Sequence, residues 1–146
     1  MKRITLLLLA VLCSYGLSAQ NWLTDFDQAQ AQASEQHLPI VLVFQGSDWC
    51  APCIRLDREI WSTDAFREYA PEHFVMLKAD FPRRKQNVLP AEQAAANAKL
   101  AERYNKNGIF PLVLVLDAEG KVLGHAGYER LSPEQYIEKL ESFTRS

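Results

Sequence analysis

The chain has 146 residues, a formal net charge of −2 and a hydrophobic fraction of 48%. This nearly neutral balance argues against a protein that binds nucleic acid or a membrane surface through basic residues. The length suits one ordinary domain with a substantial core, and no internal repeat or low-complexity linker divides it.

The N-terminal residues have the pattern of an export signal. Lys2 and Arg3 are followed by the almost wholly apolar residues 4–12, and a small residue, Ala19, suits signal-peptidase cleavage. The apolar run falls short of the roughly 20 residues that a membrane span needs. The sequence therefore predicts a signal peptide over residues 1–19 and a periplasmic or otherwise exported protein.

The mature domain is predicted as residues 20–146. The number and spacing of its cysteines limit the functions that it can have. Cys13 raises a lipoprotein alternative, although the bulky Leu12 before it does not suit the usual lipobox. After cleavage only Cys50 and Cys53 remain, whereas a secreted disulfide scaffold would use more cysteines, spread along the chain. A redox centre is favoured over a static disulfide, because so small a loop removes little entropy from the unfolded chain.

The first half of the domain predicts a helix, a central strand and two further helices. Apolar residues recur at helical spacing over residues 22–33, and Thr24 could cap this helix. Residues 40–44 form a continuous, β-branched-rich run, typical of a central strand covered on both faces. A turn at residues 46–48 then leads into a helix at the cysteine pair and a short helix that carries Phe66.

The second half alternates strands and helices and includes a hairpin. It predicts, in chain order, a strand over 74–79, a polar basic loop over 80–89, a helix from Pro90 to Tyr104, strands over 112–116 and 121–126, and a helix from Ser132 to Phe143. The pattern as a whole indicates an α/β domain with a mixed central sheet flanked by helices.

Three motifs resemble those of an exported bacterial thioredoxin-like family. They are Gly-Ser-Asp-Trp-Cys-x-x-Cys at residues 46–53, Asp-Phe-Pro at 80–82 and Gly-Ile-Phe-Pro at 108–111. Zinc sites also use Cys-x-x-Cys, but here the pair lies at a strand-to-helix junction and Pro111 precedes a later strand. The resemblance covers nearly all of the mature chain and implies the thioredoxin fold.

The resemblance implies distinct roles for the two cysteines. Cys50 would lie exposed at a helix N-terminus, where unpaired N–H groups and the helix dipole stabilise the attacking thiolate. Cys53, one turn further into the helix, would resolve the mixed disulfide. Pro52 is tolerated in a first helical turn and would stiffen the ring. The redox-active disulfide would then serve in place of any cofactor.

The same resemblance implies a substrate-binding surface beside the cysteines. Pro111 would be a cis-proline that faces the pair, and the backbone of Phe110 would pair with an extended substrate like an added strand. Trp49 would be a surface aromatic that shields the reacting sulfur atoms, with ordinary packing as the alternative.

One position departs from the family pattern. Thioredoxin carries a buried aspartate before the motif that is thought to accept the proton of the second cysteine, and the matching residue here is Phe44. Either water does this work, or Asp48, Asp57 or Asp80 reaches the site as a proton relay.

The favoured function is an exported thiol–disulfide oxidoreductase that acts on protein cysteines in the reducing direction. Residues 51–52 bring no positive charge that would favour a strong oxidant, and a negative charge at Asp48 would disfavour the thiolate. We expect a membrane thiol electron donor, protein thiol or disulfide substrates and a monomer. The alternatives are an oxidase or isomerase, and a non-enzymatic module that binds a partner or a soft metal such as Cu(I).

Two further features of the sequence have simple explanations. The three histidines are scattered and lack metal-ligand spacing to the cysteine pair, so no metal site is predicted. The basic stretch Arg83-Arg84-Lys85 could recognise an acidic partner, or it could be an ordinary solvated loop.

Overall fold

The computed structural model describes residues 20–145, so the predicted signal peptide and its cleavage site lie outside the described residues. A four-stranded sheet forms the centre, in the order β2-β1-β3-β4. β1 is parallel to β2 and antiparallel to β3, which is antiparallel to β4. The strands are β1 (Ile40–Gln45), β2 (Val75–Asp80), β3 (Leu112–Leu116) and β4 (Val122–Ala126).

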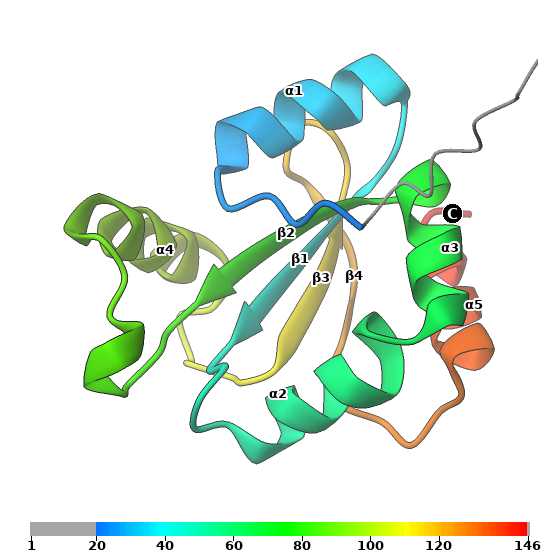
Figure 1. Cartoon of the computed structure of the whole chain (residues 1–146). Helices are drawn as coiled ribbons and strands as arrows, with labels where there is room; N and C mark the ends of the chain where they lie inside the picture. Colours follow the sequence, from blue (N-terminus) through cyan, green and yellow to red (C-terminus); the bar gives the residue numbers. More distant parts are fainter. Residues whose placement is uncertain (1–19, 146) are drawn as a thin grey trace, which may run out of the picture.

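Helices cover both faces of this sheet (Figure 1). They are α1 (Phe26–Gln36), α2 (Ala51–Leu56), α3 (Asp64–His73), α4 (Ala91–Tyr104) and α5 (Pro133–Ser142), with a π-helical turn η1 (Asp57–Trp61) and a 3₁₀ turn η2 (Lys85–Asn87). Between residues 20 and 145, no helix has the length and apolar character that a membrane span requires. The mixed, helix-flanked α/β sheet predicted from the sequence is confirmed.

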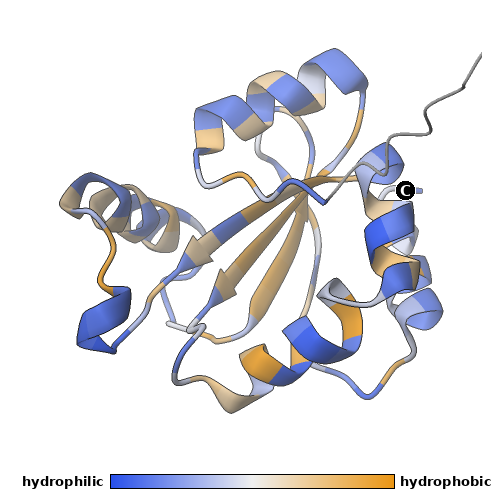
Figure 2. Ribbon diagram, viewed as in Figure 1, coloured by the Kyte–Doolittle hydropathy of each residue, from blue (hydrophilic) through white to orange (hydrophobic). Residues whose placement is uncertain are grey.

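The alternation of side chains along β1 divides the core into two clusters. Val41 and Val43 pack with α2, η1, α3 and α5, whereas Ile40, Leu42 and Phe44 pack with α1 and α4. All five side chains are at most 1% exposed. Figure 2 shows the consequence, an apolar sheet inside helices whose outer faces are hydrophilic. A continuous apolar run is therefore what this central position requires.

Two helix starts differ from the sequence prediction. Asp25, not Thr24, caps α1 by accepting the Gln28 N–H at 2.7 Å. The helix starts later because Leu23 is still extended, since it exchanges backbone hydrogen bonds with β2. Pro90 lies just before α4 as its N-cap, with an extended ψ of 142°, so the first helical residue is Ala91.

The helix that begins at the cysteine pair continues into a turn that the sequence did not predict. Cys53, Leu56 and Ile60 share the buried face as expected, but residues 57–61 form the wider π turn. The turn brings Trp61 into the core, where its ring centroid lies 4.8 Å from that of Phe66. The active-site helix is thus anchored at its far end by large buried side chains.

This anchoring predicts that alanine substitutions at two isoleucines of the same segment lower the stability by very different amounts. Ile60 is 0% exposed and Ile54 is 45% exposed. Ile60→Ala should lower the free energy of unfolding by about 2–5 kcal/mol, because it removes buried methyl groups and leaves a cavity. The matched Ile54→Ala should change it by less than about 0.5 kcal/mol. Urea denaturation measures both, and equal losses would contradict the assignment of the buried face.

Candidate active site

The two cysteines lie where β1 passes into α2. Cys50 is the N-cap of α2 and is joined to Cys53 by a disulfide, with a Cα–Cα distance of 5.2 Å. The Cys53 N–H donates to the Sγ of Cys50 at 3.3 Å, and the Cys50 N–H donates to the Gly46 carbonyl at 2.9 Å. The sulfur atom of Cys50 therefore occupies the position at which a helix N-terminus favours negative charge.

The expectation that Cys50 is exposed is wrong for this disulfide form. Cys50 and Cys53 are each 4% exposed. The disulfide draws the sulfur of Cys50 toward a cysteine on the buried face of α2, while Ala51 and Pro52 at the tip of the turn remain exposed. Pro52 lies in the first helical turn, as predicted. A reaction partner must therefore approach closely over this tip.

Trp49 is held firmly beside the disulfide. Its Nε1 donates to the Phe81 carbonyl at 2.7 Å, and the Arg83 guanidinium lies 3.6 Å from the ring centroid. On its other side the ring covers Gly46, where an added Cβ would lie 2.3 Å from a ring atom. Glycine is needed here for this close approach. Trp49 is therefore a half-buried side chain with a fixed position.

The peptide bond between Phe110 and Pro111 is cis, as predicted, while the role of these residues in substrate binding stays a prediction. The Phe110 ring meets both Trp49 and Phe81 edge-on, with centroid distances of 5.5 Å in each case. The buried Asn105 side chain holds Ile109, the residue before Phe110. Its amide nitrogen donates to the Ile109 carbonyl and its amide oxygen accepts the Ile109 N–H, both at 2.8 Å. The structure thus brings the cis-proline loop against the aromatic side chain next to Cys50.

Asp48 anchors the loop between β2 and α4. Its carboxylate accepts the backbone N–H groups of Arg83 and Arg84 at 2.9 and 3.0 Å and the Asn87 side-chain amide at 2.9 Å. The Arg83 N–H bond, followed by the Asn87 bond, holds the pKa of Asp48 below its ordinary value of 3.8. The described contacts of this carboxylate are with the loop rather than with a sulfur atom.

The other two candidate proton acceptors also have partners away from the sulfur atoms. Asp80 accepts the Ser47 N–H at 2.9 Å and the Ser47 hydroxyl at 2.6 Å, which ties the end of β2 to the turn before the cysteines. Asp57 accepts the Ser62 hydroxyl at 3.2 Å. Phe44 is fully buried in the apolar cluster beneath α1 and α4. Within residues 20–145, no carboxylate has a described contact with Cys50 or Cys53.

The sequence did not predict the positioning roles of four residues that shape the site. Phe81, Arg83, Asn105 and Gly46 position Trp49 or the cis-proline loop. Phe81 was part of a recognised motif and Gly46 of another, so the resemblance could have pointed to them. The aromatic contact of Arg83 and the double hydrogen bond of Asn105 have no local sequence signal.

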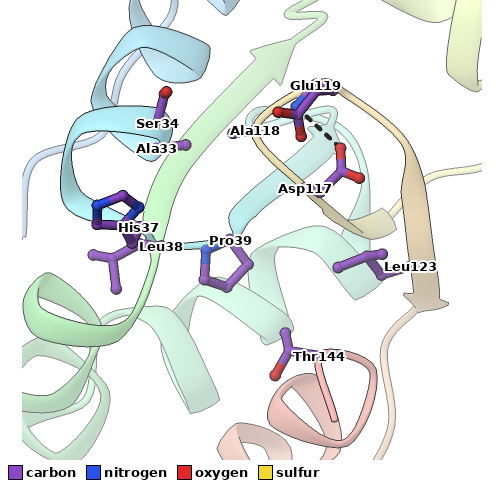
Figure 3. A pocket seen from close by; sticks show the side chains of 10 residues that line it. All are labelled: Ala33, Ser34, His37, Leu38, Pro39, Asp117, Ala118, Glu119, Leu123 and Thr144. Atoms are coloured by element: carbon purple, nitrogen blue, oxygen red, sulfur yellow. Dashed lines mark hydrogen bonds between the residues drawn. The ribbon is translucent and has the colours of Figure 1, made fainter. Parts of the chain in front are cut away.

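A separate pocket lies at the opposite end of the sheet (Figure 3). It has a volume of about 320 Å³ and lies between His37 and Pro39, just before β1, and the turn from Asp117 to Glu119 after β3. The pocket lies at the start of β1 and the cysteine pair follows its end, so the pocket is not part of the thiol site. Among the described residues, no group of three or more His, Cys, Asp or Glu side chains could hold a metal ion.

The anchoring role of Asp48 can be tested by hydrogen exchange. Asp48→Ala should speed exchange of the Arg83 and Arg84 amide protons several-fold, because both lose their acceptor. Asp57→Ala removes an acid whose described side-chain partner is Ser62, and it should leave both rates unchanged. NMR measures the exchange, and equal rates in Asp48→Ala and the wild type would rule out the anchor.

The same carboxylate should have a defined pH dependence. A folded pKa below 3.8 means that the stabilising contribution of Asp48 is fully present above about 3.8 and is lost as pH falls through the lower value. The amide chemical shifts of Arg83 and Arg84 should therefore titrate with a midpoint below 3.8. A midpoint above the ordinary value would contradict the described hydrogen bonds.

Comparison with known proteins agrees with the fold and with thiol–disulfide oxidoreductase chemistry. A family model described as "Thioredoxin-like" matches residues 21–118. The "Disulfide bond reductase DsbH" of Chlamydia pneumoniae is 36% identical over 117 residues, which cover 80% of this chain and 69% of that protein. The solved structure "DsbH Oxidoreductase" has a TM-score of 0.78 at 34% identity and covers 86% of this chain and 85% of that one. A thioredoxin from Thermus thermophilus has a TM-score of 0.64 at 15% identity, covering 87% of this chain and 88% of the other, and so shares the fold. The chain belongs to the thioredoxin-like family.

Proposed function

We propose that this thiol–disulfide oxidoreductase is exported and reduces disulfides in other proteins. The observation that carries the proposal is the Cys50–Cys53 disulfide at the start of α2, with the cis Phe110–Pro111 loop packed against the neighbouring Trp49. The export signal over residues 1–19 and the functional domain over residues 20–146 are part of this proposal.

The reaction begins with the reduced protein. The Cys50 thiolate attacks one sulfur of a substrate disulfide, which forms a mixed disulfide and releases the first substrate thiol. The Cys53 thiolate then attacks the Sγ of Cys50, releases the second substrate thiol and forms the disulfide seen in the structure. Two electrons pass from the cysteine pair to the substrate, which takes up two protons.

The helix N-terminus supplies the stabilisation that Cys50 needs. The Cys53 N–H already points at the Sγ of Cys50 and is a hydrogen-bond donor for a thiolate at the same place. The helix dipole adds to this effect. Water accepts the proton of Cys53, since Phe44 offers no base and the neighbouring carboxylates have other described partners.

The substrate binds in an extended form next to the cis-proline. The backbone of Phe110 pairs with the segment around the reacting cysteine, while Trp49 and Pro52 border the disulfide. The carbonyl and N–H of Ile109 are both held by Asn105, so the loop that receives the substrate has a fixed backbone. A loop whose backbone is already fixed loses less conformational entropy when the substrate binds.

The reducing direction is supported by two observations. Ala51 and Pro52, between the cysteines, carry no charge that would stabilise the thiolate further. The relative from C. pneumoniae is named a disulfide bond reductase. A reductant outside the cytosol needs a source of electrons, so we propose that a membrane thiol carrier reduces the Cys50–Cys53 disulfide again.

The roles of the two cysteines can be tested with a trapping variant. Reduced Cys53→Ser should accumulate a mixed disulfide between Cys50 and a disulfide-containing protein substrate, because the resolving thiol is missing. Non-reducing electrophoresis would show the adduct, and dithiothreitol should release it. The double variant Cys50→Ser/Cys53→Ser is the control without a nucleophile. Failure of Cys53→Ser to form any adduct would refute the assignment of Cys50 as the attacking thiol.

The direction of electron flow can be tested by the reduction potential of the protein from Gln20 onward. Trp49 fluorescence can follow the transition in dithiothreitol or glutathione buffers, since its ring lies beside the disulfide. We expect a two-electron transition below about −220 mV, nearer to thioredoxin at about −270 mV than to a strong oxidant at about −120 mV. A value above about −180 mV would instead indicate an oxidase or isomerase.

A further inference from the structure

Exposed apolar side chains lie on three segments at the end of the sheet that carries the disulfide. In the part of the chain between residues 20 and 145, the large hydrophobic side chains that are exposed are Ile54 at 45%, Val88 at 72%, Ile109 at 51% and Val122 at 44%. Ile54 follows Cys53, Ile109 precedes the cis peptide bond, and Val88 lies in the loop after β2; only Val122 lies elsewhere. Single exposed apolar residues are ordinary, but a group beside a reactive centre indicates a contact surface.

The same end of the molecule carries a concentration of positive charge. Residues 81–89 include Arg83, Arg84 and Lys85 but no carboxylate, and all three cations are exposed. Arg55, exposed on α2 two residues after Cys53, adds a fourth cation. Figure 1 shows that this loop and the start of α2 lie at the same end of the sheet, where β1 and β2 end.

The loop has a fixed backbone rather than a freely solvated one. Asp48 binds two of its backbone N–H groups and the Asn87 amide, and the buried Asn97 donates to the Asp80 carbonyl at 2.9 Å where the loop begins. The guanidinium of Arg83 is fixed over Trp49. Cations on a preorganised backbone lose less entropy when they bind a charged partner.

Among the described residues, neither Asp48 nor Asp80 forms a salt bridge with these cations, although the charge of Arg84 acts on Asp48. Asp48 and Asp80 turn their oxygen atoms toward N–H groups of the loop and toward Ser47, so they support the loop from beneath. Within the loop itself, residues 81–89 carry three cations and no carboxylate. The outward side of the loop is therefore positive although the whole chain has a net charge of −2.

We propose that this surface selects protein substrates whose reacting cysteine is flanked by apolar residues and by aspartate or glutamate. We call it the basic rim, and it consists of Arg55, Arg83, Arg84 and Lys85 with the apolar Ile54, Val88 and Ile109. Apolar neighbours of the cysteine contact the isoleucines, and carboxylates further along the extended segment reach Arg84 and Lys85. The inference rests on the proposed function, because it specifies which substrates the cysteine pair reduces.

The test compares three peptides that differ only in charge. Each carries one cysteine between apolar residues, capped as a mixed disulfide with a neutral small thiol, and two Glu, two Gln or two Lys residues nearby. Reduced wild-type protein is mixed with each peptide, and Trp fluorescence gives the second-order rate of disulfide exchange. We expect the Glu peptide to react about three- to tenfold faster than the Gln peptide, and the Lys peptide to react slowest. High salt should reduce these differences because it screens exposed charges.

Charge reversal locates the effect. The variant R84E/K85E should prefer the Lys peptide over the Glu peptide. The matched control K121E/R145E reverses two exposed cations at the other end of the sheet, near the pocket of Figure 3, and should keep the wild-type order of rates. The salt dependence of the wild-type protein gives an independent test that needs no variant.

The outcomes separate this inference from the proposed function. Equal rates for the three peptides at low salt would overturn charge selection and leave the reductase function standing. An equal loss of preference in both double variants would overturn the assignment to the basic rim. No exchange with any peptide would overturn the proposed function, and the inference with it.

Discussion

The geometry of the site depends on two carboxylates that join the turn before the cysteines to the loop after β2. Asp48 belongs to the turn and binds the loop, while Asp80 belongs to the end of β2 and binds Ser47 in the turn. These reciprocal hydrogen bonds connect segments more than thirty residues apart, with separations of 33 and 35 between the bonded residues. They bring the Phe81 carbonyl to the Trp49 Nε1–H, which donates a hydrogen bond to it. The Trp49 ring in turn packs against Phe110 of the cis-proline loop. Acids that the sequence offers as proton acceptors thus have a structural use.

In this arrangement, the group that stabilises the Cys50 thiolate is a backbone N–H and not an acid or base. The sulfur of Cys50 has a backbone N–H donor and a helix terminus, which stabilise a thiolate without any titrating partner. Cys53 lies on the buried face of α2, and Phe44 brings an apolar ring where thioredoxin has an acid. Under the proposed mechanism, solvent accepts the proton that is released in the resolving step.

The sequence predicts those features that depend on local pattern or on recognised motifs. Strand β1, the buried face of α2 and the cis peptide at Pro111 were predicted correctly, since periodicity and motif order determine them. The cap of α1 was not, because it depends on the pairing of Leu23 with the distant strand β2. The π turn after α2 and the burial of Cys50 in the disulfide form were not predicted either. Asp48 shows the limit most clearly: nothing near it in the sequence indicates that its partners are residues 83–87.

The burial of Cys50 in the disulfide form also bears on the approach of a partner. Cys50 and Cys53 are each only 4% exposed, whereas Ala51 and Pro52 at the tip of the turn are exposed. A disulfide in an extended or locally unfolded segment can lie between this tip and the backbone of Phe110. Such segments have few fixed side chains by which to be recognised, so charge and apolar character near the cysteine become the available signals. Under our proposal, the basic rim recognises these signals.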